Sequence, residues 1–133
     1  MIVLDTHALL WMDCNDATLG SESRRLIEDA WRTDTVAVSA ISFWEVAMLV
    51  QRGRVVLPVA VESWRAELLQ AGIQEIPIDG RIALLATSFQ DLHQDPADRF
   101  IVATAMHRGA LLVTADSKIL EWQAGLTSQD ARV

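Results

Sequence analysis

The sequence predicts an α/β fold built around a parallel sheet, and three observations on the 133-residue chain support that prediction. Short apolar runs alternate with longer segments of helical periodicity, which is typical of βαβ units. Glycines and an Asp-Pro pair stand at the segment boundaries, where helix caps are needed. The chain is 51% hydrophobic, enough for a packed core. Its length suits one domain over 1–133.

The expected strands are the short apolar runs, with the last one the weakest: 2–5, 35–38, 73–77, 111–114 and 126–129. The expected helices fill the gaps between the strands: 6–13, 20–32, 41–52, 59–71, 79–91, 96–108 and 117–123. Gly72 and Gly109 each follow a helix, where a left-handed residue is wanted. Asp95-Pro96 places a capping acid before a proline at a helix start. The sheet therefore has four or five parallel strands.

The composition excludes several classes of protein. A net charge of −7 argues against a protein that holds nucleic acid by broad electrostatic attraction. No apolar stretch approaches the roughly 20 residues of a membrane span, and the N-terminal residues have no basic region typical of a signal peptide. The single cysteine, Cys14, excludes an internal disulfide, and we expect it to be a small buried side chain. We expect a cytoplasmic protein without a membrane partner.

Four acidic residues stand where strand-like runs give way to helices: Asp5, Glu45, Asp98 and Asp116. In a parallel sheet, all strand-to-helix turns lie at one edge, and ligands bind where the strand order reverses. If the first three strands run outward and the fourth returns beside the first, Asp5 and Asp116 face each other across that point. Glu45 then lies next to Asp5, and Asp98 enters from the helix before the fourth strand. An all-oxygen cluster suits Mg²⁺ or Mn²⁺ and indicates metal-assisted hydrolysis of a phosphodiester.

Each acid also has an ordinary explanation as a helix cap. Asp5 and Asp116 have the position of N-caps, and Glu45 follows Ser42 at the spacing of a capping box. Asp98 stands at the same offset from Asp95. Capping explains each acid singly, but it does not explain why four of them converge. Asp79 also follows an apolar run, but its strand lies at the sheet edge, so we interpret it as a cap.

Three hydroxyl side chains stand beside the acids, namely Thr6, Ser42 and Thr114. They are candidates for hydrogen bonds to the carboxylates or to a metal-bound water. Their local roles at helix starts and strand ends compete equally with that function.

The histidines and tryptophans give weaker signals. His7 is close to Asp5, but a histidine on a helix surface is the more common case. His93 and His107 have no partners at metal spacing, so we expect them outside the site. Most tryptophans suit core packing, whereas Trp11 and Trp44 lie on helices that adjoin the acids.

The sequence resembles PIN-domain ribonucleases, in particular the toxins of VapBC-type toxin–antitoxin pairs. The matching motifs occur in the family's order and span residues 2 to about 120: Val3-Leu4-Asp5-Thr6-His7-Ala8-Leu9, Ser39-Ala40-Ile41-Ser42-Phe43-Trp44-Glu45, Asp95-Pro96-Ala97-Asp98-Arg99-Phe100-Ile101-Val102-Ala103-Thr104-Ala105 and Leu112-Val113-Thr114-Ala115-Asp116. The tail after Trp122 departs from the family pattern, which leaves the fifth strand open.

The resemblance implies a three-layer α/β/α PIN-like fold and cleavage of RNA with Mg²⁺ or Mn²⁺. It implies a catalytic and metal-binding role for Asp5, Glu45, Asp98 and Asp116. It also implies a homodimer and a cognate antitoxin whose peptide arm covers the toxin. Because the segment 41–50 is apolar nearly all round, we expect Phe43, Trp44 and Met48 to form part of the antitoxin groove.

Two other classes of function compete, namely phosphoryl transfer and binding without catalysis. A phosphoryl-transfer domain of the receiver kind needs an acceptor aspartate on the third strand and a lysine on the last strand. This chain offers only Asp79 beyond Pro77, and its one lysine, Lys118, lies at a helix start. A phosphatase of the haloacid-dehalogenase kind needs Asp-x-Asp after the first strand, where the chain has Asp5-Thr6-His7. A catalytically silent PIN-like fold that acts only as a binding module is the second alternative, and the presence of all four acids weighs against it.

Overall fold

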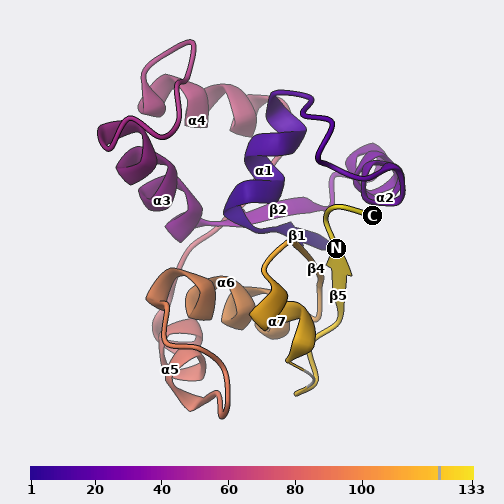
Figure 1. Ribbon diagram of the computed structural model, residues 1–133, viewed down its shortest axis with the longest axis vertical. Helices are drawn as coiled ribbons and strands as arrows, with labels where there is room; N and C mark the ends of the chain where they lie inside the picture. The colour runs from indigo at the N-terminus through magenta and orange to yellow at the C-terminus, as the bar shows by residue number, and fades with distance from the viewer. Residues whose placement is uncertain (123) are drawn as a thin grey trace.

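In the computed structural model, which describes residues 1–122 and 124–133, five parallel strands form one sheet (Figure 1). The strands are β1 (Ile2–Leu4), β2 (Val36–Ser39), β3 (Gln74–Ile76), β4 (Leu111–Thr114) and β5 (Ser128–Asp130). Their order across the sheet is β3-β2-β1-β4-β5. The chain therefore runs outward from β1 to β3 and returns to place β4 beside β1, which confirms the expected order. The strand that the sequence left open does form, as β5 at the sheet edge.

Helices cover both faces of the sheet, and their bounds are α1 (Thr6–Asp13), α2 (Ser21–Arg32), α3 (Ala40–Gln51), α4 (Val61–Gln70), α5 (Gly80–Ser88), α6 (Pro96–His107) and α7 (Ser117–Glu121). The first four lie on one side of the sheet and the last three on the other (Figure 1). The three-layer α/β/α architecture is thus confirmed. The expected helix 117–123 reached residue 123, which lies outside the described residues. None of the helices in the described ranges is both long and apolar enough to cross a membrane.

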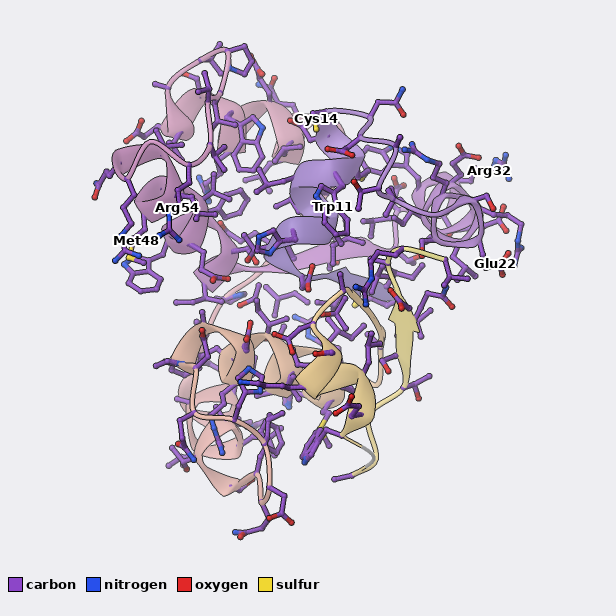
Figure 2. All side chains as sticks on the ribbon, viewed as in Figure 1. Trp11, Cys14, Glu22, Arg32, Met48 and Arg54 are labelled. Carbon is purple, nitrogen blue, oxygen red and sulfur yellow. The ribbon has the colours of Figure 1, made fainter. Side chains whose placement is uncertain are left out.

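Helix α2 shows how the outer layers are built from amphipathic segments. Ile27 is buried against the sheet, whereas Glu22 and Arg32 point outward at the periphery (Figure 2). Arg25 pairs with Glu22 at 2.6 Å and with Asp29 at 3.2 Å on this solvent face. Such exposed pairs at helical spacing stabilise a helix only by tenths of a kcal/mol, about 0.2–0.5 each. Burial of the apolar face therefore dominates the stability of this layer.

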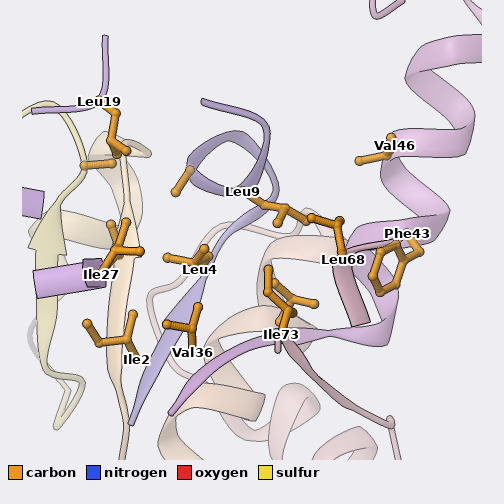
Figure 3. Close-up of a cluster of buried hydrophobic side chains, with 14 of the residues drawn as sticks. Ile2, Leu4, Leu9, Leu19, Ile27, Val36, Phe43, Val46, Leu68 and Ile73 are labelled. Carbon is orange, nitrogen blue, oxygen red and sulfur yellow. The ribbon is translucent and has the colours of Figure 1, made fainter. Parts of the chain in front are cut away.

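The central strands are buried on both faces, as expected for a parallel sheet between two helical layers. Side chains alternate along β1, so that Ile2 and Leu4 join one core and Val3 joins the other. The first core lies under α1–α4, where Leu9, Phe43 and Leu68 pack over the sheet (Figure 3). Because β1 contributes to both cores, its carboxyl end is held rigidly, and Asp5 follows directly after it.

Helix α5 ends three residues earlier than the sequence suggested. We expected a helix over 79–91, but Phe89 at the C-cap is extended and the segment to Asp95 forms a loop. Phe89 and Leu92 are buried in the second core, which anchors this loop to the domain. The loop leads directly into α6 and brings one additional side chain to the candidate site.

Candidate functional site

A cavity of about 400 Å³ opens at the carboxyl edge of the sheet, where the strand order reverses between β1 and β4. All four predicted acids line it, as do Thr6, His7, Trp11, Asp95 and Ala115. The acids come from four separate segments: Asp5 follows β1, Glu45 lies on α3, Asp98 on α6, and Asp116 follows β4. The fold thus brings together carboxylates that lie far apart in the sequence.

Asp5 is the most deeply buried of the four, with 7% of its surface exposed. Its Oδ1 accepts a hydrogen bond from the Ala8 amide at 2.8 Å, which caps α1. Its Oδ2 accepts one from the Thr114 hydroxyl at 2.5 Å. Burial raises the pKa of Asp5 above its ordinary value, and the bonds from Thr114 and Ala8 oppose that rise.

Glu45 is positioned by α3 and by Thr6. The helix begins at Ala40 with Ser39 as its N-cap, so the capping-box interpretation of Ser42 and Glu45 is wrong. Thr6 Oγ1 lies 2.5 Å from Glu45 Oε1 and 3.1 Å from Ser42 Oγ. Because an ionised carboxylate can only accept, Thr6 donates its single proton to Glu45, and Ser42 donates to Thr6.

The pKa of Glu45 is raised mainly by burial, and repulsion by the Asp98 and Asp95 carboxylates adds to the rise. The Thr6 hydrogen bond acts in the opposite direction. A half-buried carboxylate that is repelled by its neighbours is stabilised by any cation that enters the cavity.

Asp98 lies in the first turn of α6, where Asp95 caps the helix by accepting from the Asp98 amide at 3.2 Å. Oδ2 of its own carboxylate lies 2.7 Å from His93 Nε2. Burial raises the pKa of Asp98, as does repulsion by Asp95 and Asp116, whereas the His93 hydrogen bond lowers it.

Asp116 combines a cap with a place in the cluster. Its Oδ1 accepts from the amides of Lys118 at 2.8 Å and Ile119 at 3.1 Å, which caps α7. Its Oδ2 lies 3.9 Å from His93 Nε2. Capping and convergence are therefore not alternatives, since one oxygen of Asp116 serves the helix while the other faces the cluster.

His93 was missed by sequence reasoning, which placed it outside the site. Ligand atoms of His93, Asp98 and Asp116 lie within 4.8 Å of one another. The expectation failed because α5 ends at Ser88, and the loop that follows folds back against the start of α6. The sequence did contain a local signal for His93, because a residue two positions before a capping Asp-Pro pair must lie near the start of that helix.

Several other residues differ from expectation. Cys14 is exposed at the end of α1 and not buried as expected. Phe43 is buried, with its ring centroid 5.9 Å from that of Trp64, so it is no part of an open groove. Trp44, by contrast, is 53% exposed. Asp79 caps α5 by accepting from the Ile82 amide at 3.0 Å and, as interpreted, does not line the acidic cavity.

The donor set fits a hard divalent cation. Four carboxylates around one cavity supply the oxygen ligands that Mg²⁺ and Mn²⁺ prefer. Burial and repulsion by neighbouring aspartates raise the pKa of both Glu45 and Asp98, and a bound cation would relieve this electrostatic strain. Asp5, Glu45, Asp98 and Asp116 are the residues that would hold it.

Known proteins resemble this chain in both sequence and fold. Residues 2–123 match the PIN domain family. The chain is 34% identical over 119 residues to Ribonuclease VapC22 of Mycobacterium tuberculosis, covering 89% of this chain and 88% of the relative. VapBC2 from Rickettsia felis, solved bound to a DNA fragment from its promoter, has a similar fold, with a TM-score of 0.72, 16% identity and coverage of 97% and 98%. A toxin–antitoxin complex from Klebsiella pneumoniae gives a TM-score of 0.64, 20% identity and coverage of 96% of each chain.

Proposed function

The chain belongs to the PIN-domain family, and from that premise we propose that it is an endoribonuclease that depends on Mg²⁺ or Mn²⁺ and acts as the toxin of a toxin–antitoxin pair. The observation that carries the proposal is the convergence of Asp5, Glu45, Asp98 and Asp116 on one cavity at the switch point of the sheet. Family membership also removes the receiver-like alternative, which the sequence had left open.

The four carboxylates would hold the cation, and neighbouring hydroxyls orient two of them. Thr114 fixes the rotamer of Asp5, and Thr6 fixes that of Glu45. When bound, a divalent cation polarises the scissile phosphate and makes water a better nucleophile. Because the chain carries a net charge of −7, an RNA strand approaches this edge favourably only after the acidic cluster is neutralised.

Cleavage of a fluorescent single-stranded RNA by the purified protein tests the proposal. We expect cleavage with Mg²⁺ or Mn²⁺, none in excess EDTA, and recovery when metal is restored. Asp5→Asn should lower the rate by orders of magnitude while the fold is retained. Asp79→Asn is the matched control, because Asp79 also caps a helix after a strand but lies outside the cavity. Undiminished cleavage in EDTA contradicts metal dependence, and metal binding without cleavage favours the binding-module alternative.

A second cavity indicates how an antitoxin would reach the acidic site. This groove, of about 530 Å³, lies between α1 and the segment after α3, and its apolar lining includes Leu10, Leu49 and Val55–Pro58. Trp11, Cys14 and Arg54, which also line it, are labelled in Figure 2. His7 and Trp11 line both the groove and the acidic cavity. An apolar peptide arm in the groove would therefore continue towards the carboxylates.

We propose that the arm of a cognate antitoxin occupies this groove and places a basic side chain, best supplied by arginine, against the acids. Such a cation takes the electrostatic place of the metal and blocks the site. The solved complexes with similar folds include toxin–antitoxin assemblies, which supports a partner of this kind. The sequence predicted an antitoxin groove that includes Phe43, Trp44 and Met48. Burial of Phe43 contradicts the part given to that residue, whereas a contact at the exposed Trp44 stays a prediction.

A negative charge introduced into the groove tests this assignment. Val56 is 91% exposed, so Val56→Asp should leave the fold intact and weaken the binding of the co-expressed antitoxin. Leu84→Asp is the matched control, because Leu84 is 73% exposed on α5, away from the groove. Equal affinities for the two variants, measured by calorimetry, would place the arm elsewhere.

We also propose a homodimer, supported by the exposed indole of Trp44 on the nearly all-apolar helix α3. A large aromatic side chain in solvent is typical of an interface anchor. Trp44→Arg should shift the sedimentation coefficient towards that of a monomer, whereas Val56→Arg should not. An unchanged sedimentation profile for Trp44→Arg excludes α3 as the dimer surface.

A further inference from the structure

We propose that His93 is a positioning residue, which orients the Asp98 carboxylate through its Nε2 proton and is itself held in place by Arg99. The inference rests on the proposed metal-dependent function, because Asp98 matters only if it holds the cation. It assigns a role to two side chains that are neither among the four acids nor among the hydroxyls beside them.

The His93 ring is placed to donate to Asp98. Nε2 lies 2.7 Å from Asp98 Oδ2 and 3.9 Å from Asp116 Oδ2, and only 16% of the side chain is exposed. Nδ1 is fully buried and has no hydrogen-bond partner within the described part of the chain. A proton on Nδ1 would therefore be buried without an acceptor, which is costly. The ring proton belongs on Nε2, where it faces the carboxylate.

The position of His93 is set by the guanidinium of Arg99, which binds four backbone carbonyls of the preceding segment. Nε donates to the His93 carbonyl at 3.1 Å. Nη1 donates to Ala86 at 2.8 Å, and Nη2 donates to Phe89 at 3.1 Å and Leu92 at 2.9 Å. The planar fork of arginine suits this arrangement, since its donors have fixed directions. Arg99 thus ties the loop from Phe89 to Asp95 to the helix that carries Asp98.

A second anchor supports the same loop from Trp122, the C-cap residue of α7. The indole of Trp122 donates to the Gln90 carbonyl at 2.8 Å, and its ring packs edge-on against Phe89 with centroids 4.9 Å apart. Two titratable side chains of this doubly anchored loop reach the acid cluster: His93 hydrogen-bonds the Asp98 carboxylate, whereas Asp95 lines the cavity and repels Asp98. Rigid support is what a residue needs if it is to fix the rotamer of a metal-binding carboxylate.

Direct ligation by His93 is the competing role. A nitrogen ligand and a carboxylate ligand each need about 2.0–2.2 Å to the metal, with lone pairs directed at it. In this structure Nε2 and Oδ2 face each other at hydrogen-bond distance, so the Nε2 position is used by the proton. Hydrogen bonding by a neighbour that does not bind the metal typically contributes a factor of 10–100 in affinity. The two roles therefore predict different responses to substitution.

Mn²⁺ binding separates these roles without relying on turnover. His93→Leu should weaken Mn²⁺ binding by roughly 10-fold, as measured by calorimetry. His93→Gln supplies an amide N–H at similar reach and should restore affinity to within about 3-fold, whereas a lost ligand would not be restored. His107→Leu is the matched control, because His107 is exposed at the end of α6. Electron spin-echo spectra of the Mn²⁺-loaded wild type should show no nitrogen coupling.

The role of Arg99 is tested by Arg99→Lys, because a single ammonium group cannot donate hydrogen bonds to all four carbonyls. We expect a loss of Mn²⁺ affinity similar to that of His93→Leu, and no further loss in the double variant, because both act through one contact. Additive losses would show that Arg99 acts independently of His93. Nitrogen coupling in the wild type would overturn the role that we propose for His93. So would a wild-type Mn²⁺ affinity in His93→Leu. Neither result would overturn the proposed function. Absence of Mn²⁺ binding by the wild type overturns the proposed function as well.

Discussion

The Thr114 hydroxyl donates a hydrogen bond to the Asp5 carboxylate, which joins the ends of the adjacent strands β4 and β1 across the site. Thr114 Oγ1 also accepts from the Asp116 amide at 3.1 Å. One fully buried hydroxyl thus links two of the four acids, although Asp5 and Thr114 lie 109 positions apart in the sequence. The relative placement of Asp5 and Asp116 is therefore set by the register of two strands and by this bond.

Removal of that hydroxyl should destabilise the protein and raise the pKa of Asp5 further, because the bond opposes the effect of burial. Thr114→Val keeps the shape and leaves a buried carboxylate oxygen without its donor, which costs about 1–3 kcal/mol. Chemical denaturation at pH 7 should show this loss. Thr114→Ser retains the hydroxyl and should recover most of it. If Thr114→Val and Thr114→Ser are equally stable, the bond contributes nothing.

Metal should stabilise the wild type by binding only the folded chain. At 100 times the dissociation constant the gain is about 2.7 kcal/mol, so Mn²⁺ should raise the melting temperature. Glu45→Gln removes a carboxylate that burial and the neighbouring acids disfavour. It should therefore melt higher than wild type in EDTA and gain less from Mn²⁺.

The matched control for this experiment is Glu67→Gln, which changes an exposed glutamate on α4. It should leave both melting temperatures nearly unchanged. A Glu45→Gln variant that melts below wild type in EDTA would contradict the repulsion that we assign to the cluster.

The raised pKa values also predict a pH dependence of the metal-free protein. A carboxyl whose pKa is higher in the folded than in the unfolded chain makes folding less favourable as pH rises from the unfolded value, near 4, through the folded value. Asp98→Asn removes one such group. The melting temperature of Asp98→Asn minus that of wild type, measured in EDTA, should be near zero at pH 4 and positive at pH 7.

The variant is compared with wild type at each pH because the pKa values of other acids are shifted in the opposite direction. The pKa of Glu75 is lowered mainly by its hydrogen bonds with Arg65, and its contribution to stability is lost as pH falls. That effect is common to both proteins and cancels. A difference that is constant between pH 4 and pH 7 would count against a desolvated Asp98.

Much of the fold was predictable because local chemistry and topology agree. Helix α1 begins and ends where the apolar pattern places it, and Asp5 caps it as the residue type suggests. The placement of β4 beside β1 follows from right-handed crossovers and the position of the apolar runs. These rules also bring Asp5 and Asp116 to one edge, so their proximity needed no further information.

The rest depends on contacts that local patterns do not encode. His93 joins the cluster because the Arg99 guanidinium donates to one carbonyl at the end of α5 and to three carbonyls of the following loop, a segment that the sequence pattern predicts as helical. Helix α3 is apolar nearly all round, so its sequence does not distinguish the buried Phe43 from the exposed Trp44. The difference arises from α4, where Trp64 packs against Phe43.

Gly20 is required by the close approach of a distant segment, which gives a last prediction. A Cβ at Gly20 would lie 2.1 Å from the carbonyl carbon of Val133, so any side chain must displace the segment that follows β5. That displacement breaks two hydrogen bonds. The Gly20 amide donates to the Ala131 carbonyl at 2.8 Å, and the Ser23 amide donates to the Val133 carbonyl at 3.0 Å. These hydrogen bonds satisfy the amide of Gly20, which is the N-cap of α2, and the amide of Ser23 in the first turn; no side chain caps this helix.

Gly20→Ala should therefore lower the unfolding free energy by about 2 kcal/mol, at roughly 1 kcal/mol for each lost hydrogen bond. Thermal denaturation should show a clear fall in the melting temperature. Gly80→Ala is the matched control, because a Cβ there meets nothing within 4 Å and the residue opens α5. Its melting temperature should stay equal or rise slightly, since alanine reduces the freedom of the unfolded chain. Equal melting temperatures for the two variants would mean that the segment after β5 can move without a loss of stability and does not stabilise α2.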